Sequence, residues 1–234
     1  MLALVGGDEL NPGNEPQDEA LVAGARPGPA YVIATAAARG RPDLAVKHAT
    51  RWFAGLGLEV EELPLRSRSD AASEEIAERA RGAGLFYILG GDPGLVVDML
   101  EGTSTWTAIA AAWRAGAALG GSSAGAMALG QWTLIRGGRW PQHDTRRYKP
   151  ALGIVPNVAV IPHFNTFGTR WVDSAGLARP EVAVLLALDE RTAAVWSSEG
   201  WRALGAGTVT VFSDGGEPRV FRPGERIEGL PEPA

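Results

Sequence analysis

Short apolar runs alternate with helix-like segments through residues 2–129, and this alternation constrains the fold more than any other feature. The runs with the length and composition of strands are Leu2–Gly7, Ala30–Ala37, Leu58–Leu65, Leu85–Leu89 and Ala117–Gly121. Helical patterns lie at Pro42–Phe53, from Asp70 to about Arg81, and at Leu95–Leu100, Trp106–Ala115 and Ala124–Leu129. The alternation predicts a three-layer α/β fold, a mostly parallel sheet flanked by helices, with active-site groups at the carboxyl ends of the strands.

After residue 150 the sequence changes to short strand-like runs separated by tight turns. These runs are Val155–Ile161, Val182–Leu188, Thr192–Trp196, Thr208–Phe212 and Arg219–Phe221. We expect them to extend the main sheet or to add a β-ribbon to it. No linker or shift in composition marks a boundary, so residues 1–234 are predicted to form a single domain.

Composition excludes several classes of function. The formal net charge is −5, which disfavours a nucleic-acid partner because phosphate neutralisation needs a concentrated basic surface. The sequence contains no cysteine, so disulfides, thiolate zinc sites and cysteine nucleophiles are excluded. No run has the length of a signal-peptide core or of a membrane span, and we therefore expect a cytoplasmic protein with no membrane partner.

One segment departs from this acidic balance. Its cations are Arg136, Arg139, Arg146, Arg147 and Lys149. Two interpretations remain open for residues 136–149: a solvated loop, or a substrate lid with Gly137 and Gly138 as hinges.

The turn Gly121-Ser122-Ser123-Ala124-Gly125 carries the strongest chemical signal. A G-x-S-x-G turn exposes its central serine because small neighbours let the chain bend sharply from a strand into a helix. A strand-like run precedes this turn and a helical segment follows it, as the mechanism requires. Ser123 is therefore the candidate nucleophile, and a merely tight strand–helix turn is the alternative.

A serine nucleophile needs a base, and the chain offers three histidines. His48 lies within a helical segment, where a surface or packing role is expected. His143 lies in the basic segment, where a solvated role is expected. His163 follows an apolar strand and Pro162, which places it at a strand end. We therefore predict His163 as the base, with a structural histidine as the alternative.

The third member of such a triad is a carboxylate that orients the imidazole. Asp189 and Glu190 follow an apolar strand, and Asp144 and Asp173 are rivals that spacing alone does not exclude. The resulting order along the chain is serine, histidine, acid. Because the ordinary α/β-hydrolase order is serine, acid, histidine, a different scaffold is expected to carry the site.

A second glycine turn, Gly90-Gly91-Asp92-Pro93, follows the strand-like run Leu85–Leu89. Its backbone N–H groups are predicted to complete an oxyanion hole with the N–H of Ala124. The alternative is a plain strand-to-helix turn in which Asp92 caps the helix and Pro93 takes its first position. Both interpretations can hold together, and Asp92 is also a candidate for contact with substrate.

Several of these motifs occur in the order found in one known family. They are ILGGD at Ile88–Asp92, GSSAGA at Gly121–Ala126, PHF at Pro162–Phe164 and DERTA at Asp189–Ala193. The sequence resembles the cyanophycinase and dipeptidase E (aspartyl dipeptidase) group of serine peptidases, from GGDE near the start to about residue 196. The resemblance implies a class I glutamine-amidotransferase-like fold, with a serine in place of the usual cysteine, and a homodimer.

The resemblance also implies roles for particular residues. It places the nucleophile on Ser123, the base on His163 and the acid on Glu190. The oxyanion donors would be the backbone N–H groups of Gly91 and Ala124.

The segment after His163 bears on the substrate. Phe167 and Thr169 stand where cyanophycinases carry arginines. Thr169-Arg170 instead resembles the Thr-Arg with which aspartyl dipeptidases hold the substrate aspartate, across a shorter loop. Arg170 is therefore a candidate for binding a substrate carboxylate as a bidentate fork, with a surface arginine as the alternative.

The sequence thus predicts a serine exopeptidase that hydrolyses small peptides through an acyl-enzyme. Asp-containing dipeptides and cyanophycin-like β-Asp peptides are the expected substrates, and no metal or organic cofactor is implied. The alternatives are an amidase or esterase on the same scaffold and a catalytically inactive binding protein.

Overall fold

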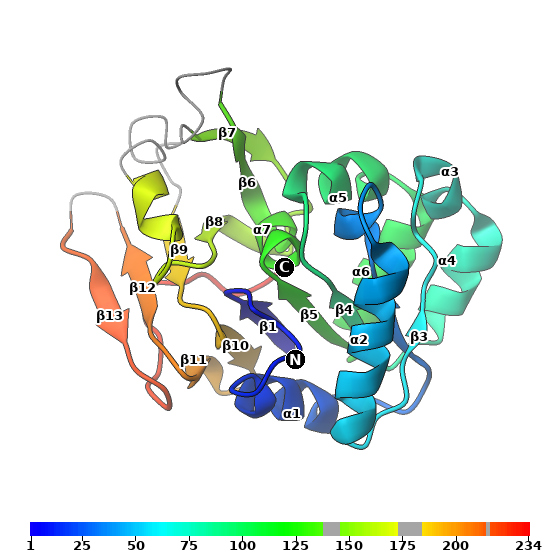
Figure 1. Ribbon diagram of the computed structural model, residues 1–234, viewed down its shortest axis with the longest axis horizontal. Helices are drawn as coiled ribbons and strands as arrows, with labels where there is room; N and C mark the ends of the chain where they lie inside the picture. Colours follow the sequence, from blue (N-terminus) through cyan, green and yellow to red (C-terminus); the bar gives the residue numbers. More distant parts are fainter. Residues whose placement is uncertain (138–145, 173–183, 214–215) are drawn as a thin grey trace.

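The computed structural model describes residues 1–137, 146–172, 184–213 and 216–234. Figure 1 shows two sheets that share one body with the surrounding helices. The larger sheet has the order β11–β10–β1–β5–β4–β2–β3. The bounds of these strands, in the same order, are Gly200–Gly205, Thr192–Ser197, Leu2–Val5, Ala118–Ser122, Leu85–Ile88, Ala30–Ile33 and Glu61–Glu62.

Strands β1, β5, β4, β2 and β3 of the larger sheet are parallel neighbours. Strands β10 and β11 add an antiparallel hairpin on the other side of β1. Part of the C-terminal third therefore extends the main sheet, as the sequence predicts.

The smaller sheet has the order β13–β12–β9–β8–β6–β7. Its strands, in that order, are Arg219–Phe221, Val209–Phe212, Val184–Leu188, Val155–Ile161, Gly130–Arg136 and Arg146–Pro150. Strands β6, β8 and β9 are parallel, and the outer strands pair antiparallel to them. The sequence predicts these C-terminal runs as strands but does not predict that most of them form a second sheet.

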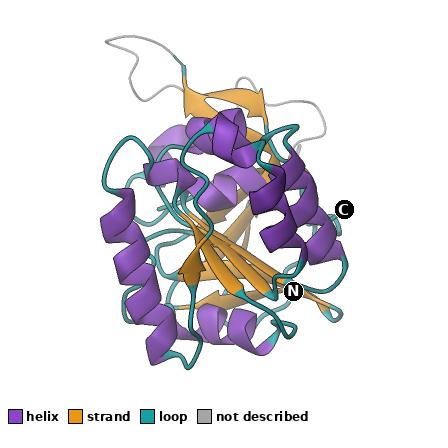
Figure 2. Cartoon of the chain, turned by 90° about the vertical axis from the view of Figure 1, so that its right-hand side faces the viewer, coloured by secondary structure: helices purple, strands orange, loops and turns teal. Residues whose placement is uncertain are grey.

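Helices cover both faces of the larger sheet (Figure 2). Helices α1 (Glu15–Ala23) and α2 (Pro42–Gly55) bury Leu21 and Phe53 against one face. Residues of α4 (Glu74–Arg81), α5 (Pro93–Leu100), α6 (Ser104–Arg114) and α7 (Ala124–Leu129) join the core cluster of the opposite face, together with the smaller sheet. The predicted α/β fold, with mostly parallel sheets flanked by helices, is confirmed.

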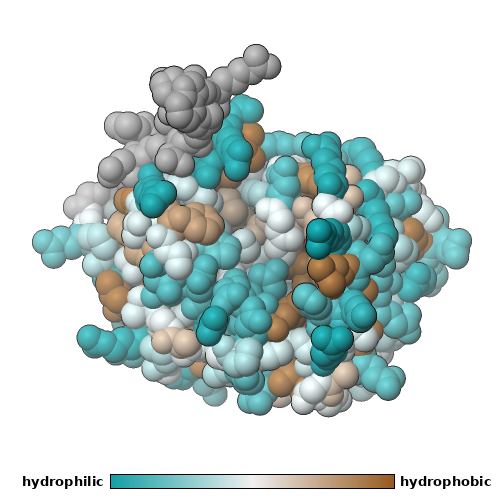
Figure 3. All heavy atoms as spheres, viewed as in Figure 1, coloured by the Kyte–Doolittle hydropathy of each residue, from teal (hydrophilic) through white to brown (hydrophobic). Residues whose placement is uncertain are grey.

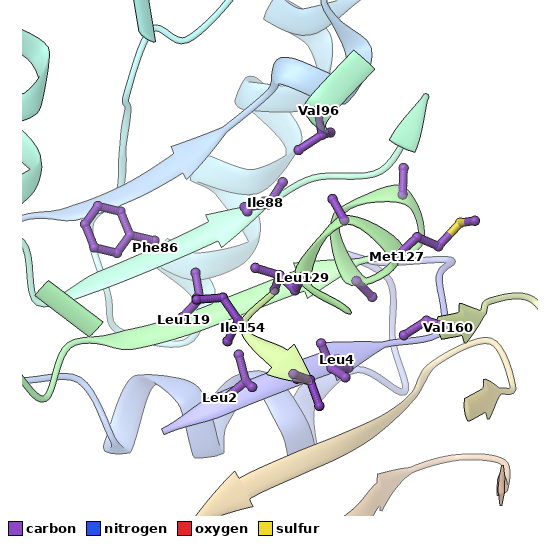
Figure 4. Packing of buried hydrophobic residues seen from close by; sticks show 14 of the residues in the cluster. Leu2, Leu4, Phe86, Ile88, Val96, Leu119, Met127, Leu129, Ile154 and Val160 are labelled. Carbon is purple, nitrogen blue, oxygen red and sulfur yellow. The ribbon is translucent and has the colours of Figure 1, made fainter. Parts of the chain in front are cut away.

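The central strands are almost wholly apolar because both of their faces are buried. Leu2 and Leu4 of β1 lie in the same cluster as Ile88 and Leu119 of neighbouring strands (Figure 4). The alternate residues, such as Val5, belong to the cluster beneath α1 and α2. This two-sided burial is what the continuous apolar runs in the sequence indicate.

The strand predicted at Leu58–Leu65 is wrong in its extent. Only Glu61–Glu62 pairs with β2 as β3. Pro64 has no N–H to donate to a ladder, so the strand ends there. Leu63 and Leu65 are nonetheless fully buried, and this burial explains the apolar pattern without a strand.

The helix predicted from Asp70 to Arg81 is two helices, and Asp70 does not cap it. Ser67 caps α3 (Arg68–Ala71) by accepting from the Asp70 N–H. Ser73 caps α4 by accepting from the Ile76 N–H. The extended backbone at Ser73 breaks the helix, and its hydroxyl replaces the lost backbone acceptor.

The strand predicted at Ala30–Ala37 ends early, at Ile33. Residues Thr35–Ala37 form a 3-10 turn, η1. This turn brings the carbonyl of Ala36 within 2.9 Å of the Asp92 N–H. The chain thus leaves the sheet to support the second glycine turn.

Hydrophilic residues cover most of the face shown in Figure 3, with hydrophobic residues scattered between them. Among the described residues, the large exposed hydrophobic side chains are Leu44, Phe167 and Val220. No helix in the described part of the chain is long and apolar enough to cross a bilayer.

A buried carboxyl on α1 gives the fold a predicted pH dependence. Asp18 has no exposed surface, and Trp52 Nε1 donates to its Oδ2 at 2.8 Å. Burial raises the pKa of Asp18 to about 7, against the opposing effect of the Trp52 hydrogen bond. The unfolded chain ionises this group near pH 4, so its contribution to stability is complete below that pH and is lost as pH rises towards 7.

Asp18→Asn is therefore expected to leave stability unchanged at pH 4 and to raise it above pH 7. The gain is at most on the order of 4 kcal/mol, and the asparagine oxygen still accepts from Trp52. Urea unfolding of the wild type and Asp18→Asn at pH 4 and pH 8 measures this change in the free energy of unfolding. The control is Glu19→Gln, which replaces an exposed carboxylate on the same helix. An equal effect of Asp18→Asn at both pH values would contradict the prediction.

Candidate active site

The candidate nucleophile lies in a strained turn between a strand and a helix. Strand β5 ends at Ser122 and α7 begins at Ala124. Ser123 between them has φ 49° and ψ −110°, a conformation that L-residues adopt only when the surroundings enforce it. Its N–H donates to the Val5 carbonyl and its carbonyl accepts from the Met127 N–H, each at 2.9 Å.

Sterics explain the two glycines of this turn. A Cβ on Gly121 would lie 2.7 Å from the carbonyl carbon of Gly125. A Cβ on Gly125 would lie 2.3 Å from the carbonyl oxygen of Ile88. Only glycine lets the start of α7 pack this closely on β4 and β5, which is the physical basis of the motif.

The candidate base reaches the serine from the end of β8. His163 follows Pro162, with φ 51°. Its N–H donates to the Gly6 carbonyl at 2.7 Å, which anchors the backbone beside β1. Its Nε2 lies 2.9 Å from Ser123 Oγ, within hydrogen-bond reach for proton transfer.

Glu190 completes a hydrogen-bonded chain with these two residues. Its Oε1 lies 2.8 Å from His163 Nδ1. A carboxylate in that position holds the proton on Nδ1, so Nε2 is left to accept from the serine hydroxyl. The side chains of His163 and Glu190 are 18% and 26% exposed, so the pair is largely shielded from bulk water.

Three residues after His163 hold this hydrogen-bonded chain in place, and the sequence does not single out two of them, Asn165 and Thr166. The hydroxyl of Thr166 donates to Glu190 Oε1 at 3.2 Å, and Asn165 Oδ1 accepts from the Glu190 N–H at 2.9 Å. The ring of Phe167 stacks on His163, with centroids 4.8 Å apart and planes 22° apart. The residues of the segment after His163 thus fix the orientation of both His163 and Glu190.

The second glycine turn follows β4, which pairs with β5 in the larger sheet. Gly91 has φ 144°, and a Cβ there would lie 2.3 Å from the Ala36 carbonyl oxygen. Asp92 Oδ1 accepts from the Gly94 and Leu95 N–H groups at 2.9 and 3.2 Å, so Asp92 caps α5 as the alternative interpretation holds. Ala124 is the first residue of α7, where a backbone N–H has no intrahelical acceptor.

A cavity of about 1070 Å³ joins these groups. Ser123, His163, Gly91 and Asp92 all line it. Its wall is apolar at Leu95, Met127, Leu134, Ile135, Pro162, Phe167 and Trp171.

The charged lining of this cavity is predominantly basic. Its cations are Arg39, Arg136, Arg146 and Arg170. Its described acidic members are Asp92, which caps α5, and Asp98, which pairs with Lys149. The Arg146 guanidinium lies 3.9 Å above the Trp171 ring, which fixes one cation at the wall.

The rival residues fall elsewhere. His48 lies on α2 and lines a separate groove with Trp52. Asp189 accepts from the N–H and the hydroxyl of Thr208, each at 2.8 Å, a structural role. His143, Asp144 and Asp173, and the centre of the proposed lid, lie outside the described residues.

The basic segment is only partly described. Arg136 ends β6, and Arg146 begins β7, which pairs with it as a hairpin. Within the described residues, no three His, Asp or Glu side chains gather in a way that would hold a metal ion.

Fold and site together define a protein of the serine-hydrolase class, since such triads are recognised by geometry. The model of peptidase family S51 matches residues 9–202. The chain belongs to peptidase family S51.

Individual relatives agree with this assignment. A cyanophycinase from Trichormus variabilis is 30% identical over 190 residues, covering 78% of this chain and 63% of its own length. A cyanophycinase from Synechococcus elongatus is 34% identical over 165 residues, covering 68% of this chain and 51% of its own. The chain therefore spans between about half and two thirds of the length of these relatives.

Solved structures match over nearly the whole chain. A peptidase from an acI-B1 Actinobacterium has 33% identity and a TM-score of 0.83, covering 97% of this chain and 95% of that one. A proposed peptidase E protein from Listeria monocytogenes has 17% identity and a TM-score of 0.61, covering 97% and 98%. The second likeness supports the fold alone.

Proposed function

We propose that the protein is a serine exopeptidase acting on small peptides with a carboxylate near the scissile bond. The observation that carries this proposal is the hydrogen-bonded chain from Ser123 through His163 to Glu190, of which Ser123 and His163 line the cavity. Membership of family S51 and the cyanophycinase relatives support it.

In the proposed reaction, His163 Nε2 takes the proton of Ser123 as Oγ attacks the scissile carbonyl carbon. A C–O bond forms and the carbonyl π electrons move onto oxygen. When the tetrahedral intermediate collapses, the C–N bond breaks and His163 gives its proton to the leaving amine. Water then repeats the sequence on the acyl-enzyme, and Glu190 stabilises the imidazolium in both halves.

The negative oxygen of each intermediate needs donors that are already in place. The backbone N–H groups of Gly91 and Ala124 are the proposed donors. Both belong to turns whose backbones are fixed by close packing, since neither Gly91 nor Gly125 has room for a Cβ. Preorganised donors of this kind cost no reorganisation at the moment of reaction.

The cavity supports a preference for acidic peptides. Four arginines line it, of which Arg170 is an exposed side chain three residues after Phe167. A guanidinium binds a carboxylate through two parallel hydrogen bonds, so Arg170 is the proposed carboxylate anchor. A cavity of about 1070 Å³ has room for a small peptide, since small-molecule sites are typically about 300–1,000 Å³.

A substrate panel tests the proposal. It contains Asp-Xaa dipeptides, β-Asp-Arg, neutral aminopeptidase substrates and simple esters. We expect hydrolysis of acidic dipeptides in preference to the neutral ones. Hydrolysis of esters or simple amides alone would replace the proposal with an amidase or esterase. No turnover of any substrate and no covalent labelling would leave a binding protein.

Arg170→Gln is expected to raise KM for acidic dipeptides about 10-fold or more while changing kcat little, because a charge-assisted hydrogen bond contributes roughly 1.5–3 kcal/mol. Neutral substrates should be unaffected. The matched control is Arg51→Gln, which removes an arginine that lines the separate groove. Equal loss on acidic and neutral substrates would contradict the role assigned to Arg170.

A further inference from the structure

One loop forms hydrogen bonds with His163 or with the residues next to Glu190, Gly91 and Ser123. It is the segment Gly6–Leu10 that follows β1, here called the β1 loop. The Gly6 carbonyl accepts from the His163 N–H at 2.7 Å, and the Gly7 carbonyl accepts from the Arg191 N–H at 2.9 Å. The loop therefore holds the backbone of the base and the residue beside Glu190.

The side chain of Glu9 also contacts the residues that precede the proposed oxyanion donor and the candidate nucleophile. Its Oε1 accepts from the Gly90 N–H at 2.9 Å, and its Oε2 accepts from Ser122 Oγ at 3.0 Å. Gly90 precedes the proposed oxyanion donor Gly91, and Ser122 precedes the nucleophile Ser123. A single half-buried carboxylate thus bridges the residues that come before the two reacting elements.

The Glu9 carboxylate lies close to the Gly90 turn. A Cβ on Gly90 would lie 2.7 Å from Glu9 Oε1, so glycine is needed for the carboxylate to approach the turn. Ser122 is fully buried at the end of β5. Gly90 follows β4, which pairs directly with β5, so the carboxylate bridges the carboxyl ends of two neighbouring strands.

The backbone around Glu9 is held in an unfavourable conformation. Asp8 and Leu10, on either side of it, have φ of 53° and 61°. Such values in residues other than glycine persist only where other contacts enforce them. Asn11 Nδ2 donates to Asp8 Oδ1 at 2.8 Å, and Arg191 Nε lies 2.5 Å from Asp8 Oδ2. These contacts hold the backbone next to Glu9.

We propose that Glu9 is a positioning residue that fixes the Gly90–Gly91 turn relative to the Ser123 turn, so that the oxyanion donor meets the carbonyl that the serine attacks. The inference rests on the proposed function. Glu9 acts through Gly91 and Ser123 and not on the substrate itself. Its loss should therefore weaken binding of the transition state and leave binding of the substrate almost unchanged.

The test compares Glu9→Ala, Glu9→Gln and Ser122→Ala with the wild type by kcat and KM on the best substrate of the panel. Glu9→Ala is expected to lower kcat about 10²-fold with KM within threefold, since loss of one oxyanion donor costs about 10²–10³-fold. Glu9→Gln should recover kcat to within 10-fold of wild type, because its oxygen accepts from Gly90 while its amide donates to a rotated Ser122 hydroxyl. Ser122→Ala removes one of the two hydrogen bonds to Glu9, and its kcat should lie between those of Glu9→Ala and Glu9→Gln.

Glu15→Ala is the matched control. Glu15 lies in the same N-terminal segment and also accepts from a glycine N–H, that of Gly13, but it lines the separate groove. Its kcat should equal that of the wild type. Thermal unfolding of each variant shows whether it is folded at the assay temperature, and Glu9→Gln and Ser122→Ala carry the test if Glu9→Ala is not.

Three results would overturn the inference: wild-type kcat in Glu9→Ala, a rise in KM in place of the fall in kcat, or a Glu9→Gln variant no better than Glu9→Ala. A wild-type protein that neither turns over substrate nor labels at Ser123 would overturn the proposed function and the inference with it. An active wild type with an unaffected Glu9→Ala variant would overturn the inference alone.

Discussion

His163→Ala is expected to lower kcat by about 10⁵–10⁶-fold, because the serine then has no base and the leaving amine has no acid. His163 Nε2 lies 2.9 Å from Ser123 Oγ, and no other histidine of the described residues lines the cavity. KM should change far less than kcat. Steady-state kinetics on the best substrate of the panel measures the effect.

His48→Ala is the matched control, since it removes a histidine from α2 and the separate groove. Its kcat should equal that of the wild type. A His163→Ala variant that retains a tenth or more of wild-type kcat would show that the base lies elsewhere. The remaining histidine, His143, would then be the residue to replace.

Glu190→Gln is expected to lower kcat by about 10³–10⁴-fold at neutral pH. An amide at this position presents either an oxygen or an NH₂ group to His163 Nδ1, and it carries no charge to stabilise the imidazolium. The contact is direct, with Oε1 2.8 Å from Nδ1. The variant should stay folded because Asn165 and Thr166 still hold the segment around it.

Asp144→Asn is the paired comparison, because Asp144 is the rival acid that the sequence leaves open. Its kcat should stay within a factor of two of the wild type. The opposite pattern, a large loss in Asp144→Asn with near-normal kcat in Glu190→Gln, would transfer the acid to Asp144.

Much of the site is predictable from the sequence because its signals are local. Ser123 lies between two glycines that the tight turn requires, and His163 follows an apolar strand and a proline. Both residues follow the carboxyl ends of strands in a predicted α/β fold, which is where such folds place chemistry. The structure brings the two side chains within 2.9 Å across 40 residues of sequence.

Glu9 is not predictable in the same way. Its partners Gly90 and Ser122 lie 81 and 113 residues away along the chain. No periodicity or spacing encodes a contact between a loop and two distant turns. The signal that could have found it is an acidic residue in the loop after the first strand, since that strand ends at the same edge of the sheet.

The pairing of strands is likewise not predictable from the sequence alone. The apolar runs predict strands, but a period of two does not say which strands are neighbours. Strand β8 pairs with β6 and β9 and not with the central strands, so a second sheet forms. Leu58–Leu65 misleads for a related reason, because Leu63 and Leu65 are buried without belonging to a strand.

The central claim is that Ser123 is a nucleophile activated by His163, and covalent labelling tests it most directly. The wild type is incubated with a fluorophosphonate, and intact mass and peptide mapping then locate the adduct. The account predicts a single adduct on Ser123 that is absent from Ser123→Ala. An unlabelled wild type, or an adduct that persists in Ser123→Ala, would contradict it.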